Sequence, residues 1–403
     1  MNRSQLNMFH FFILILIITT GLSHKASANN LTLRPHVKNQ NKHYIQPAAP
    51  HIASEGYVVI DADSGKIIAE KDLDKKRPPA SLTKMMTVYV AFTALKSGQL
   101  KLKDTVTVSK RAWKTPGSKM FLKEGQRVSI EDLLKGIIVD SGNDASVALA
   151  EYIAGTEANF VKLMNKQAHT LGMENSHFSD STGLPSKELY STPKDLAILA
   201  RALIKDYPEY YHWFKQKWFN FNNIKQPNRN RLLWRNPLVD GIKTGHTDDA
   251  GYALVASAKK NDMRLITVIL GAPSDAARAD GGQRLLSFGF RFYETHKLYS
   301  ANSQITTLKV WKGKTDQIAV GIDRTLYLTI PNGSYHDLEV TSNMAKNVVA
   351  PIKKGQALGE LIIKLNDKVI STRKLYALTD VEQGGLFSRL GDSIKLSFNR
   401  LVN

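Results

Sequence analysis

The 403 residues of the chain predict more than one domain, and their composition, 42% hydrophobic and 23% charged, excludes a disordered, collagen-like or multi-span membrane protein. An excess of 55 Lys and Arg over 36 Asp and Glu gives a formal net charge of +19, which favours an anionic partner: nucleic acid, anionic lipid or an acidic polymer. The chain has no cysteine, which excludes disulfide bonds, thiol catalysis and cysteine-ligated zinc.

The N-terminus has the features of an export signal. Arg3 precedes a short apolar run at 9–18, and Ala26-Ser27-Ala28 supplies the small residues of a cleavage site. We therefore predict a signal peptide at 1–28, followed by a flexible lead-in at 29–50. The alternative is an uncleaved anchor helix, although the run is shorter than the ~20 residues that span a bilayer. An exported protein meets little nucleic acid, so cell-wall polymer or anionic lipid is the better match for the basic charge.

The next segment, 51–300, mixes strands and helices. Strands at 57–60 and 66–69 flank the turn Asp63-Ser64-Gly65 and predict a hairpin. A helix is expected to open at about Ser81, with its end at Gly98 and its apolar side formed by Met85, Val88, Phe92 and Leu95. We also predict helices at 130–138, 144–153, 157–171, 193–205 and 276–289, and strands at 250–258 and 264–270. This pattern predicts an α/β (α+β) domain in which an antiparallel sheet adjoins a helical cluster.

The C-terminal part has a different period. From about residue 303, apolar residues alternate in short runs separated by Gly, Pro or Asn, and no helix pattern occurs before Asp380. The runs predict strands at 306–311, 317–322, 325–330, 358–365 and 368–378. We therefore predict a separate small all-β domain at 301–380.

Residues 384–403 predict an amphipathic helix. One side would carry most of the apolar residues, namely Leu386, Phe387, Leu390, Ile394, Phe398, Leu401 and Val402. The segment has no apolar run long enough to cross a bilayer, but it can lie in the membrane interface. We predict a membrane-anchor helix, and the alternative is a helix that packs against the all-β domain.

Three short motifs can bring catalytic side chains together. In Ser81-Leu82-Thr83-Lys84, residues three apart on a helix lie on one face, so Lys84 can reach the Ser81 hydroxyl. A lysine can take a serine proton only if burial or a neighbouring cation lowers its pKa. The same spacing occurs at Ser191, Ser257 and Ser371, where a solvated lysine is the simpler interpretation.

The second motif, Ser141-Gly142-Asn143, lies between two predicted helices and can present a hydroxyl and an amide to a cleft. The third, Lys243-Thr244-Gly245, comes just before the predicted strand at 250–258. There the glycine allows close approach of a ligand, while Lys and Thr offer donors to a carboxylate. Taken singly, each motif also fits an ordinary turn.

In this chain order, the three motifs resemble those of low-molecular-mass penicillin-binding proteins, which are serine-type D-alanyl-D-alanine carboxypeptidases of the bacterial cell wall. The resemblance runs from about Glu55 to the C-terminus and includes the stretches at 289–294 and 382–387. It implies the penicillin-binding/β-lactamase-like transpeptidase fold for 51–300. It also implies removal of the terminal D-alanine from peptidoglycan stem pentapeptides through an acyl-serine intermediate, with covalent inhibition by β-lactams.

The resemblance also implies roles for individual residues. Ser81 would be the nucleophile, Lys84 its base and Ser141 a proton relay to the leaving amine. Backbone N–H groups of Ser81 and of the strand near His246 would bind the oxyanion. The substrate would be held by the remaining motif residues and by an arginine that faces its terminal carboxylate, namely Asn143, Lys243, Thr244, Gly245, His246 and Arg278. No metal or organic cofactor is implied, and the protein is expected on the periplasmic side of the cytoplasmic membrane, peripherally anchored.

The sequence fits four other functions less well. Class A β-lactamases add a Glu-x-x-x-Asn deacylation base, and no Glu between Ser141 and Lys243 has an Asn four residues later, so slow inhibition is expected instead of efficient β-lactam hydrolysis. A D,D-endopeptidase that cuts cross-links would use the same motifs, but such relatives usually lack the β domain and the anchor. A catalytically silent wall-binding scaffold would need a damaged motif. Nucleic-acid binding is disfavoured by the export signal and by the lack of a clustered basic-aromatic motif.

Overall fold

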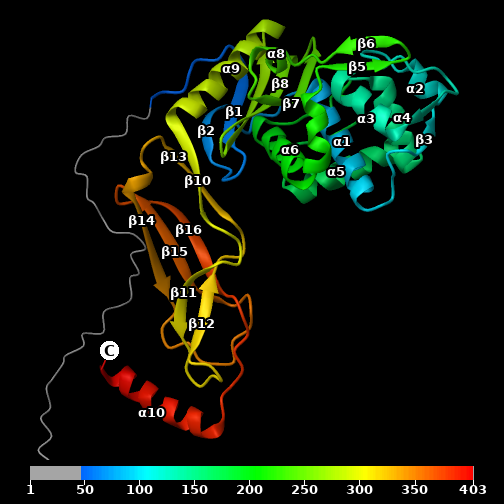
Figure 1. Cartoon of the computed structure of the whole chain (residues 1–403). Helices are drawn as coiled ribbons and strands as arrows, with labels where there is room; N and C mark the ends of the chain where they lie inside the picture. The colour runs from blue at the N-terminus through cyan, green and yellow to red at the C-terminus, as the bar shows by residue number, and fades with distance from the viewer. Residues whose placement is uncertain (1–46, 403) are drawn as a thin grey trace, which may run out of the picture.

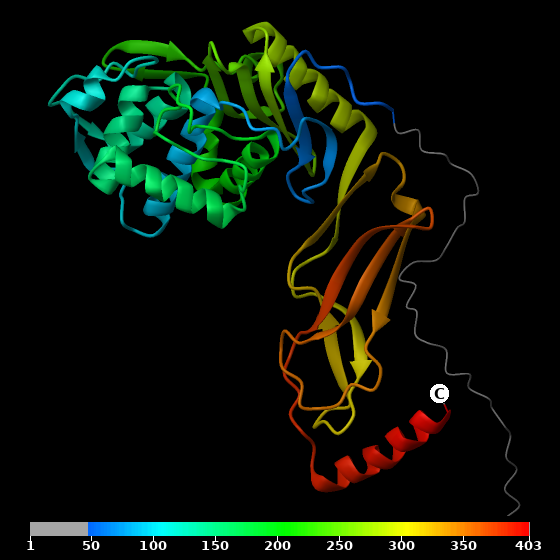
Figure 2. The same cartoon turned by 180° about the vertical axis from the view of Figure 1, so that it is seen from behind.

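The computed structural model describes residues 47–402, in which a broad N-terminal domain is followed by a slender β module and a helix. The module extends away from the N-terminal domain, and α10 (Leu386–Val402) lies at its far end in both views (Figure 1, Figure 2). The predicted fold class is confirmed. The predicted signal peptide at 1–28 and most of the lead-in at 29–50 lie outside the described residues.

A five-stranded antiparallel sheet forms the centre of the N-terminal domain. Its strands follow the order β2-β1-β9-β8-β7, with bounds Ile67–Lys71, Gly56–Asp61, Met263–Ala272, Gly251–Lys260 and Val239–Thr247. Side chains of β1 alternate between the two faces, because Tyr57 and Val59 pack toward α9 (Asp275–Phe292) while Val58 and Ile60 pack toward the other helices. The sheet is therefore covered on both faces.

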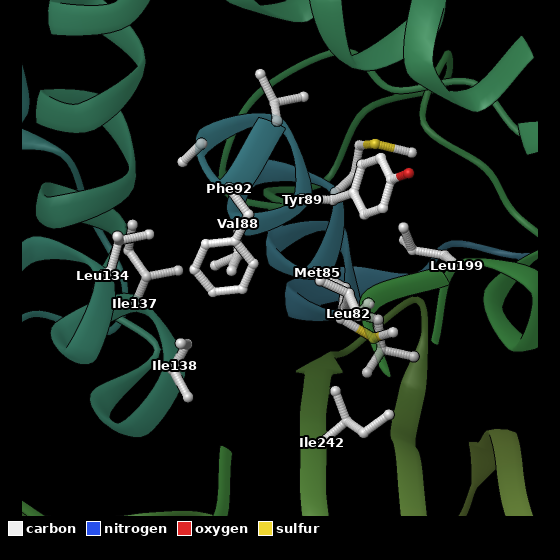
Figure 3. Packing of buried hydrophobic residues seen from close by; sticks show 14 of the residues in the cluster. Leu82, Met85, Val88, Tyr89, Phe92, Leu134, Ile137, Ile138, Leu199 and Ile242 are labelled. Carbon is white, nitrogen blue, oxygen red and sulfur yellow. The ribbon is translucent and has the colours of Figure 1, made fainter. Parts of the chain in front are cut away.

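The helical cluster surrounds α1 (Lys84–Lys96), in which every residue except Thr93 and Lys96 is buried. Figure 3 shows Val88 and Phe92 facing one set of helices and Tyr89 facing another. The prediction of a single apolar side was therefore too narrow, because α1 is the central helix and has no solvent face. The helices and turns of the cluster that bear on the site are η1 (Ala80–Thr83), α3 (Ile130–Lys135), η2 (Gly136–Asp140), α4 (Asn143–Ala154), α5 (Glu157–Leu171) and α6 (Pro193–Asp206).

Local capping explains where several helices begin. The side chains of Ser129, Thr156, Thr192 and Ser274 each accept a hydrogen bond from the backbone N–H three residues later. Each such cap contributes about 1 kcal/mol. Shorter elements complete the domain: β3 (Thr105–Thr107), α2 (Lys110–Lys114), β4 (Arg127–Ser129), α7 (Pro208–Tyr211), η3 (His212–Lys215), β5 (Trp218–Phe221), β6 (Ile224–Pro227) and α8 (Leu232–Arg235).

The β module begins as α9 continues directly into β10 (Tyr293–Tyr299), which pairs with β13 (Leu326–Pro331). The larger sheet has the order β11-β12-β16-β15-β14, with bounds Gln304–Lys309, Gln317–Gly321, Lys368–Ala377, Ala357–Leu365 and Leu338–Met344. One 3-10 turn, η4 (Tyr335–Asp337), interrupts a segment that was expected to lack helix. The predicted division at residue 300 falls between β10 and β11.

A buried polar cluster joins the two parts. The Asp61 carboxylate accepts hydrogen bonds from Ser64 Oγ and from Thr295 Oγ1, both at 2.8 Å. Thr329 Oγ1 lies 2.6 Å from Ser64 Oγ and 2.8 Å from Thr295 Oγ1. Since Asp61 and Ser64 belong to the N-terminal domain while Thr295 and Thr329 belong to β10 and β13, this cluster fixes where the module attaches.

Candidate active site

The Ser-x-x-Lys motif lies where the 3-10 turn η1 runs into α1. Ser81 belongs to the turn and Lys84 is the first residue of α1, so the α-helix begins later than predicted. The Lys84 side chain is fully buried, and its Nζ donates hydrogen bonds to Ser81 Oγ at 3.0 Å, Asn143 Oδ1 at 2.6 Å and Thr182 O at 2.6 Å. The structure thus brings Ser81, Lys84 and Asn143 into one hydrogen-bond group.

The backbone just before Ser81 has an uncommon conformation. Ala80 has a φ of +49°, in the left-handed region that residues other than glycine seldom adopt. Gly183 packs against it so closely that a Cβ there would lie 1.9 Å from Ala80 O. A glycine is therefore required at 183, and the contact holds the turn that carries Ser81.

The electrostatic surroundings of Lys84 favour its neutral form. Burial lowers the pKa of Lys84 to about 7; among the nearby charges, Asp180 and Asp144 act to raise this pKa and Arg229 acts to lower it. An ammonium has three N–H donors, which match the three acceptors found here. The neutral amine has a lone pair instead of the third donor, and this lone pair can accept the Ser81 proton.

Ser141 and Asn143 lie where η2 meets α4. The π-helical turn η2 ends at Asp140, and Ser141 then adopts a φ of +62° before α4 begins at Asn143. Asn143 Nδ2 donates to Pro116 O at 2.6 Å, which fixes its amide with the oxygen toward Lys84. The expected loop between two helices is present, although it is only two residues long.

The Lys-Thr-Gly motif lies within β7, at the edge of the sheet, rather than before a strand as its spacing suggested; the resemblance had implied a strand position. Lys243 Nζ donates to Ser141 Oγ at 2.9 Å and to Thr244 O at 3.2 Å. A Cβ on Gly245 would lie 3.1 Å from Ser81 N, so the glycine lets β7 pass close beside Ser81. His246 is exposed and its ring lies against Tyr252, with 4.0 Å between the ring centroids.

Arg278 lies behind β7, on the first turns of α9. Its side chain is almost fully buried, and its Nη1 donates to Gly245 O at 2.9 Å and more weakly to Ala253 O at 3.3 Å. Its Nη2 forms an ion pair with Asp275. Arg278 therefore holds the backbone of the strand that carries the third motif, and its charge lies close to that strand.

Some contributors to the site were not predicted. The Thr182 carbonyl, which accepts from Lys84, has no side-chain signal because any residue supplies a backbone carbonyl. Its loop is shaped by Asp180, whose Oδ1 accepts from the backbone N–H groups of Thr182 and Gly183, both at 2.6 Å. Arg229 acts on the charges of the site from the loop after β6. Its only sequence signal was a polar stretch, Asn228-Arg229-Asn230.

A cleft of about 540 Å³ opens next to Ala80, the residue before Ser81. Its walls come from the segment before Ser81, the loop after Thr182 and the end of β7, and its lining includes Ala80, Gly183, Tyr190, Thr247 and Asp249. Within residues 47–402, no three His, Asp or Glu side chains are grouped so that they could hold a metal ion.

Comparison with known proteins gives matches over both parts of the chain. The family model described as D-alanyl-D-alanine carboxypeptidase matches residues 43–274, and the one described as penicillin-binding protein 5, C-terminal domain, matches residues 293–383. The chain is 45% identical over 360 residues to the D-alanyl-D-alanine carboxypeptidase DacC of Escherichia coli (strain K12). The aligned region covers 87% of this chain and 90% of that protein.

Solved structures of penicillin-binding proteins are also similar to the chain. The chain is similar to penicillin-binding protein 5 from Haemophilus influenzae, with a TM-score of 0.82 and 41% identity, over 84% of this chain and all of that one. It is also similar to penicillin-binding protein D2 from Listeria monocytogenes in its ampicillin-bound form, with a TM-score of 0.56 and 28% identity, over 60% of this chain and all of that one.

Proposed function

The chain belongs to the D-alanyl-D-alanine carboxypeptidase family of serine peptidases, and from that premise we propose that Ser81 is the residue through which it cleaves its substrate. The observation that carries this proposal is the hydrogen-bond group in which Lys84, itself buried, contacts Ser81 and Asn143. Ser81 is the only serine or threonine hydroxyl that accepts a hydrogen bond from Lys84 within the described range. Peptide mapping of the adduct formed with penicillin tests the assignment directly.

Acylation begins with the neutral amine of Lys84. Its lone pair takes the Ser81 proton while Ser81 Oγ attacks the carbonyl carbon of the penultimate D-alanine. The carbonyl oxygen becomes an oxyanion, which the backbone N–H of Ser81 and the adjacent backbone of β7 are placed to bind, since Gly245 lets the two segments approach. Each such donor typically contributes 10²–10³-fold in rate.

Collapse of the tetrahedral intermediate breaks the bond to the terminal D-alanine. Its nitrogen must gain a proton as it leaves: the Ser141 hydroxyl supplies it and is reprotonated by Lys84, which returns to the neutral amine, while Lys243 donates to Ser141 Oγ. Water then attacks the acyl-Ser81 carbonyl, and Lys84 accepts the proton that the water loses. As this second tetrahedral intermediate collapses, the bond between Ser81 Oγ and the acyl carbon breaks, Lys84 returns the proton to Ser81 Oγ, and the peptide shortened by one D-alanine leaves.

β-Lactams follow the first half of the same path. The strained amide acylates Ser81, but its leaving nitrogen stays tethered to the acyl group and cannot diffuse away. The ampicillin-bound structure of penicillin-binding protein D2 from Listeria monocytogenes supports this proposal. No Glu between Ser141 and Lys243 has an Asn four residues later, as the deacylation base of class A β-lactamases would, so we expect a long-lived adduct.

Replacing Arg278 with alanine should weaken the use of substrates that end in a free carboxylate. A charge-assisted hydrogen bond contributes roughly 1.5–3 kcal/mol, which corresponds to about a 10- to 150-fold loss in kcat/KM. The loss should be much smaller for a peptide with an amidated C-terminus. Kinetics on the two peptides measure this difference.

Arg231→Ala is the matched control for Arg278. Arg231 also forms an ion pair with Asp275, but within residues 47–402 it makes no hydrogen bond or ion pair with β7. Its replacement should leave kcat/KM unchanged for both peptides. An equal loss on both substrates in Arg278→Ala would give Arg278 a structural role only.

We also propose that α10 anchors the protein to the outer face of the cytoplasmic membrane. Four large apolar side chains on its first turns are exposed: Leu386 by 73%, Phe387 by 92%, Leu390 by 61% and Ile394 by 65%. Such exposure is costly in water and is typical of an interfacial helix. No helix within 47–402 combines the length and the hydrophobicity needed to cross a bilayer.

The opposite side of α10 faces the β module. Asp392 accepts a hydrogen bond from the Lys312 N–H at 2.6 Å, and Leu396, one helical turn later, is only 6% exposed. Leu396 does not belong to the predicted apolar side, and its burial explains its position. The four exposed apolar residues named above lie on the other side of the helix, which supports the membrane over packing against the module.

Deleting residues 384–403 should release an active, soluble enzyme from the membrane. The motif residues all belong to the N-terminal domain, so hydrolysis of small peptide substrates should be unchanged. Fractionation of cells that express the full and the truncated chain measures the release. A truncated protein that stays with the membrane would place the anchor elsewhere.

A point variant and its control sharpen that test. Phe387→Ser should lower binding of the chain to vesicles that contain anionic lipid, because a 92% exposed aromatic side chain of α10 is lost. Val369→Ser removes a 51% exposed apolar side chain from β16 and should leave binding unchanged. Equal effects of the two variants would argue against α10 as the contact.

A further inference from the structure

Asp140, the residue before Ser141, is a buried carboxylate that the mechanism above does not use. It is 2% exposed, and neither of its carboxylate oxygens has a hydrogen-bond partner in the described part of the chain. Buried carboxylates are nearly always hydrogen-bonded, because desolvation is costly. Asp144, on the next helix, follows that rule, since its oxygens accept from Met120 N at 2.8 Å and Leu122 N at 3.0 Å. Asp140 therefore needs another explanation.

The local backbone holds Asp140 in a defined place beside the site. It ends the π-helical turn η2, and the Gly142 N–H closes this turn on Gly136 O at 3.0 Å. Ser141 follows in the left-handed conformation. Such wide turns are frequent at functional sites, where they redirect one residue of a helix. The position of Asp140 is thereby coupled to that of Ser141.

Three charged groups act on Asp140, each from a different element. Arg229 comes from the loop after β6, Lys243 from β7 and Asp144 from α4. Burial raises the pKa of Asp140 to about 7; Arg229 and Lys243 act to lower it, and Asp144 acts to raise it. Asp140 is therefore about half ionised at neutral pH and carries its full negative charge only at alkaline pH, with Arg229 and Lys243 as the nearby basic groups.

Lys243 lies in a surplus of positive charge. Burial lowers the pKa of Lys243 well below its usual range, and Lys84, Arg229 and Arg278 lower it further. Asp140 is a carboxylate that acts on Lys243 in the opposite direction and raises its pKa. Loss of Asp140 would remove this compensating charge.

The protonation of Lys243 matters because of where its hydrogen bonds go. Its Nζ donates to Ser141 Oγ and to Thr244 O, and it must have a third N–H and a full charge to meet a substrate carboxylate. We propose that Asp140 is a positioning residue whose carboxylate keeps Lys243 in its ammonium form and so sets the alkaline limit of the enzyme. This inference rests on the proposed function, which assigns Ser141 and Lys243 to the reaction.

The test is the pH profile of kcat/KM for D-alanine release by the full chain. Asp140→Asn keeps the shape of the side chain and removes its charge, so the alkaline limb should move down by about one pH unit, as expected for loss of one nearby charge. The acid limb, which follows Lys84, should not move. Asp249→Asn is the control, because Asp249 is an exposed carboxylate of the adjacent cleft and is not among the groups that act on Lys243.

A second matched pair covers the case in which Asp140→Asn does not fold. The side chains introduced by Asp140→Glu and Asp140→Gln have the same length and differ only in charge. The alkaline limb of kcat/KM should therefore have a higher apparent pKa in the Glu variant than in the Gln variant. Thermal unfolding shows which variants are folded. The proposal is overturned if the apparent pKa of the alkaline limb is the same in wild type and Asp140→Asn, or the same in Asp140→Glu and Asp140→Gln, while kcat/KM falls by the same factor at every pH. Asp140 would then be a structural residue.

Mass mapping of the penicillin adduct on the wild-type chain separates this proposal from the proposed function. An adduct on a residue other than Ser81 would remove the function on which the inference rests. An adduct on Ser81, together with equal limbs for the matched variants, would overturn the role of Asp140 alone.

Discussion

Replacing Ser81 with alanine should abolish both penicillin labelling and D-alanine release. The hydroxyl is the atom that forms the bond to the substrate, and removal of a catalytic nucleophile commonly costs 10⁴-fold or more in rate. The fold should survive, because the Ser81 side chain does not cap α1 and its hydroxyl accepts a hydrogen bond from Lys84 only, within the described residues. Intact-mass analysis after penicillin treatment, with thermal unfolding in parallel, measures both results.

Ser186→Ala is the matched control for Ser81. Ser186 is exposed and lines the cleft next to Ala80, yet it lies outside the Lys84 hydrogen-bond group. Its replacement should leave labelling intact. Persistent labelling of Ser81→Ala would end the assignment, and mapping of the labelled peptide would then identify the true nucleophile.

Lys84→Ala should slow acylation of Ser81 by about 10²–10⁴-fold, the usual contribution of a positioned general base. The serine would have no neighbouring group to take its proton. In the wild type, acylation should rise with pH through about 7, because burial lowers the pKa of Lys84 to about 7 and the neutral amine is the reactive form. Stopped-flow acylation over a range of pH measures the rate and its pH dependence.

Lys84→Arg separates the charge of Lys84 from its ability to accept a proton. Arginine keeps the positive charge but does not lose its proton at accessible pH, so this variant should be about as slow as Lys84→Ala. Thermal unfolding is needed beside the kinetics, because Lys84 also supplies hydrogen bonds to Asn143 and Thr182. Wild-type acylation by a folded variant would show that the base lies elsewhere.

Local sequence patterns were sufficient for many elements of the fold. The helix predicted at 157–171 has those bounds in α5, because Thr156 caps its start and Gly172 adopts the left-handed conformation at its end. The alternating run at 358–365 likewise matches β15 to within one residue. Caps, stops and periodicity act over a few residues, so the sequence alone carries them.

Other elements depend on partners that are distant in the chain. β7 was not predicted from its pattern, because it is buried on both faces and contains two glycines. Side chains of other elements approach Gly241, and the backbone around Ser81 approaches Gly245. The hairpin of β5 and β6 turns at Asn222-Asn223, where both residues have positive φ, but its strands are only four residues long. Such short strands give little periodic signal.

For the site, the sequence by itself determined which groups are available and in what order: a serine with a lysine three residues later, a Ser-Gly-Asn turn and a Lys-Thr-Gly stretch. Only the tertiary structure decided what these groups can do. Lys84 is hydrogen-bonded to Thr182, 98 residues away in the chain, and Lys243 to Ser141, 102 residues away. Desolvation and Coulomb interactions depend on burial and on distance in space, so the proton state of Lys84 and the charge balance between Asp140 and Lys243 arise only when these segments pack together.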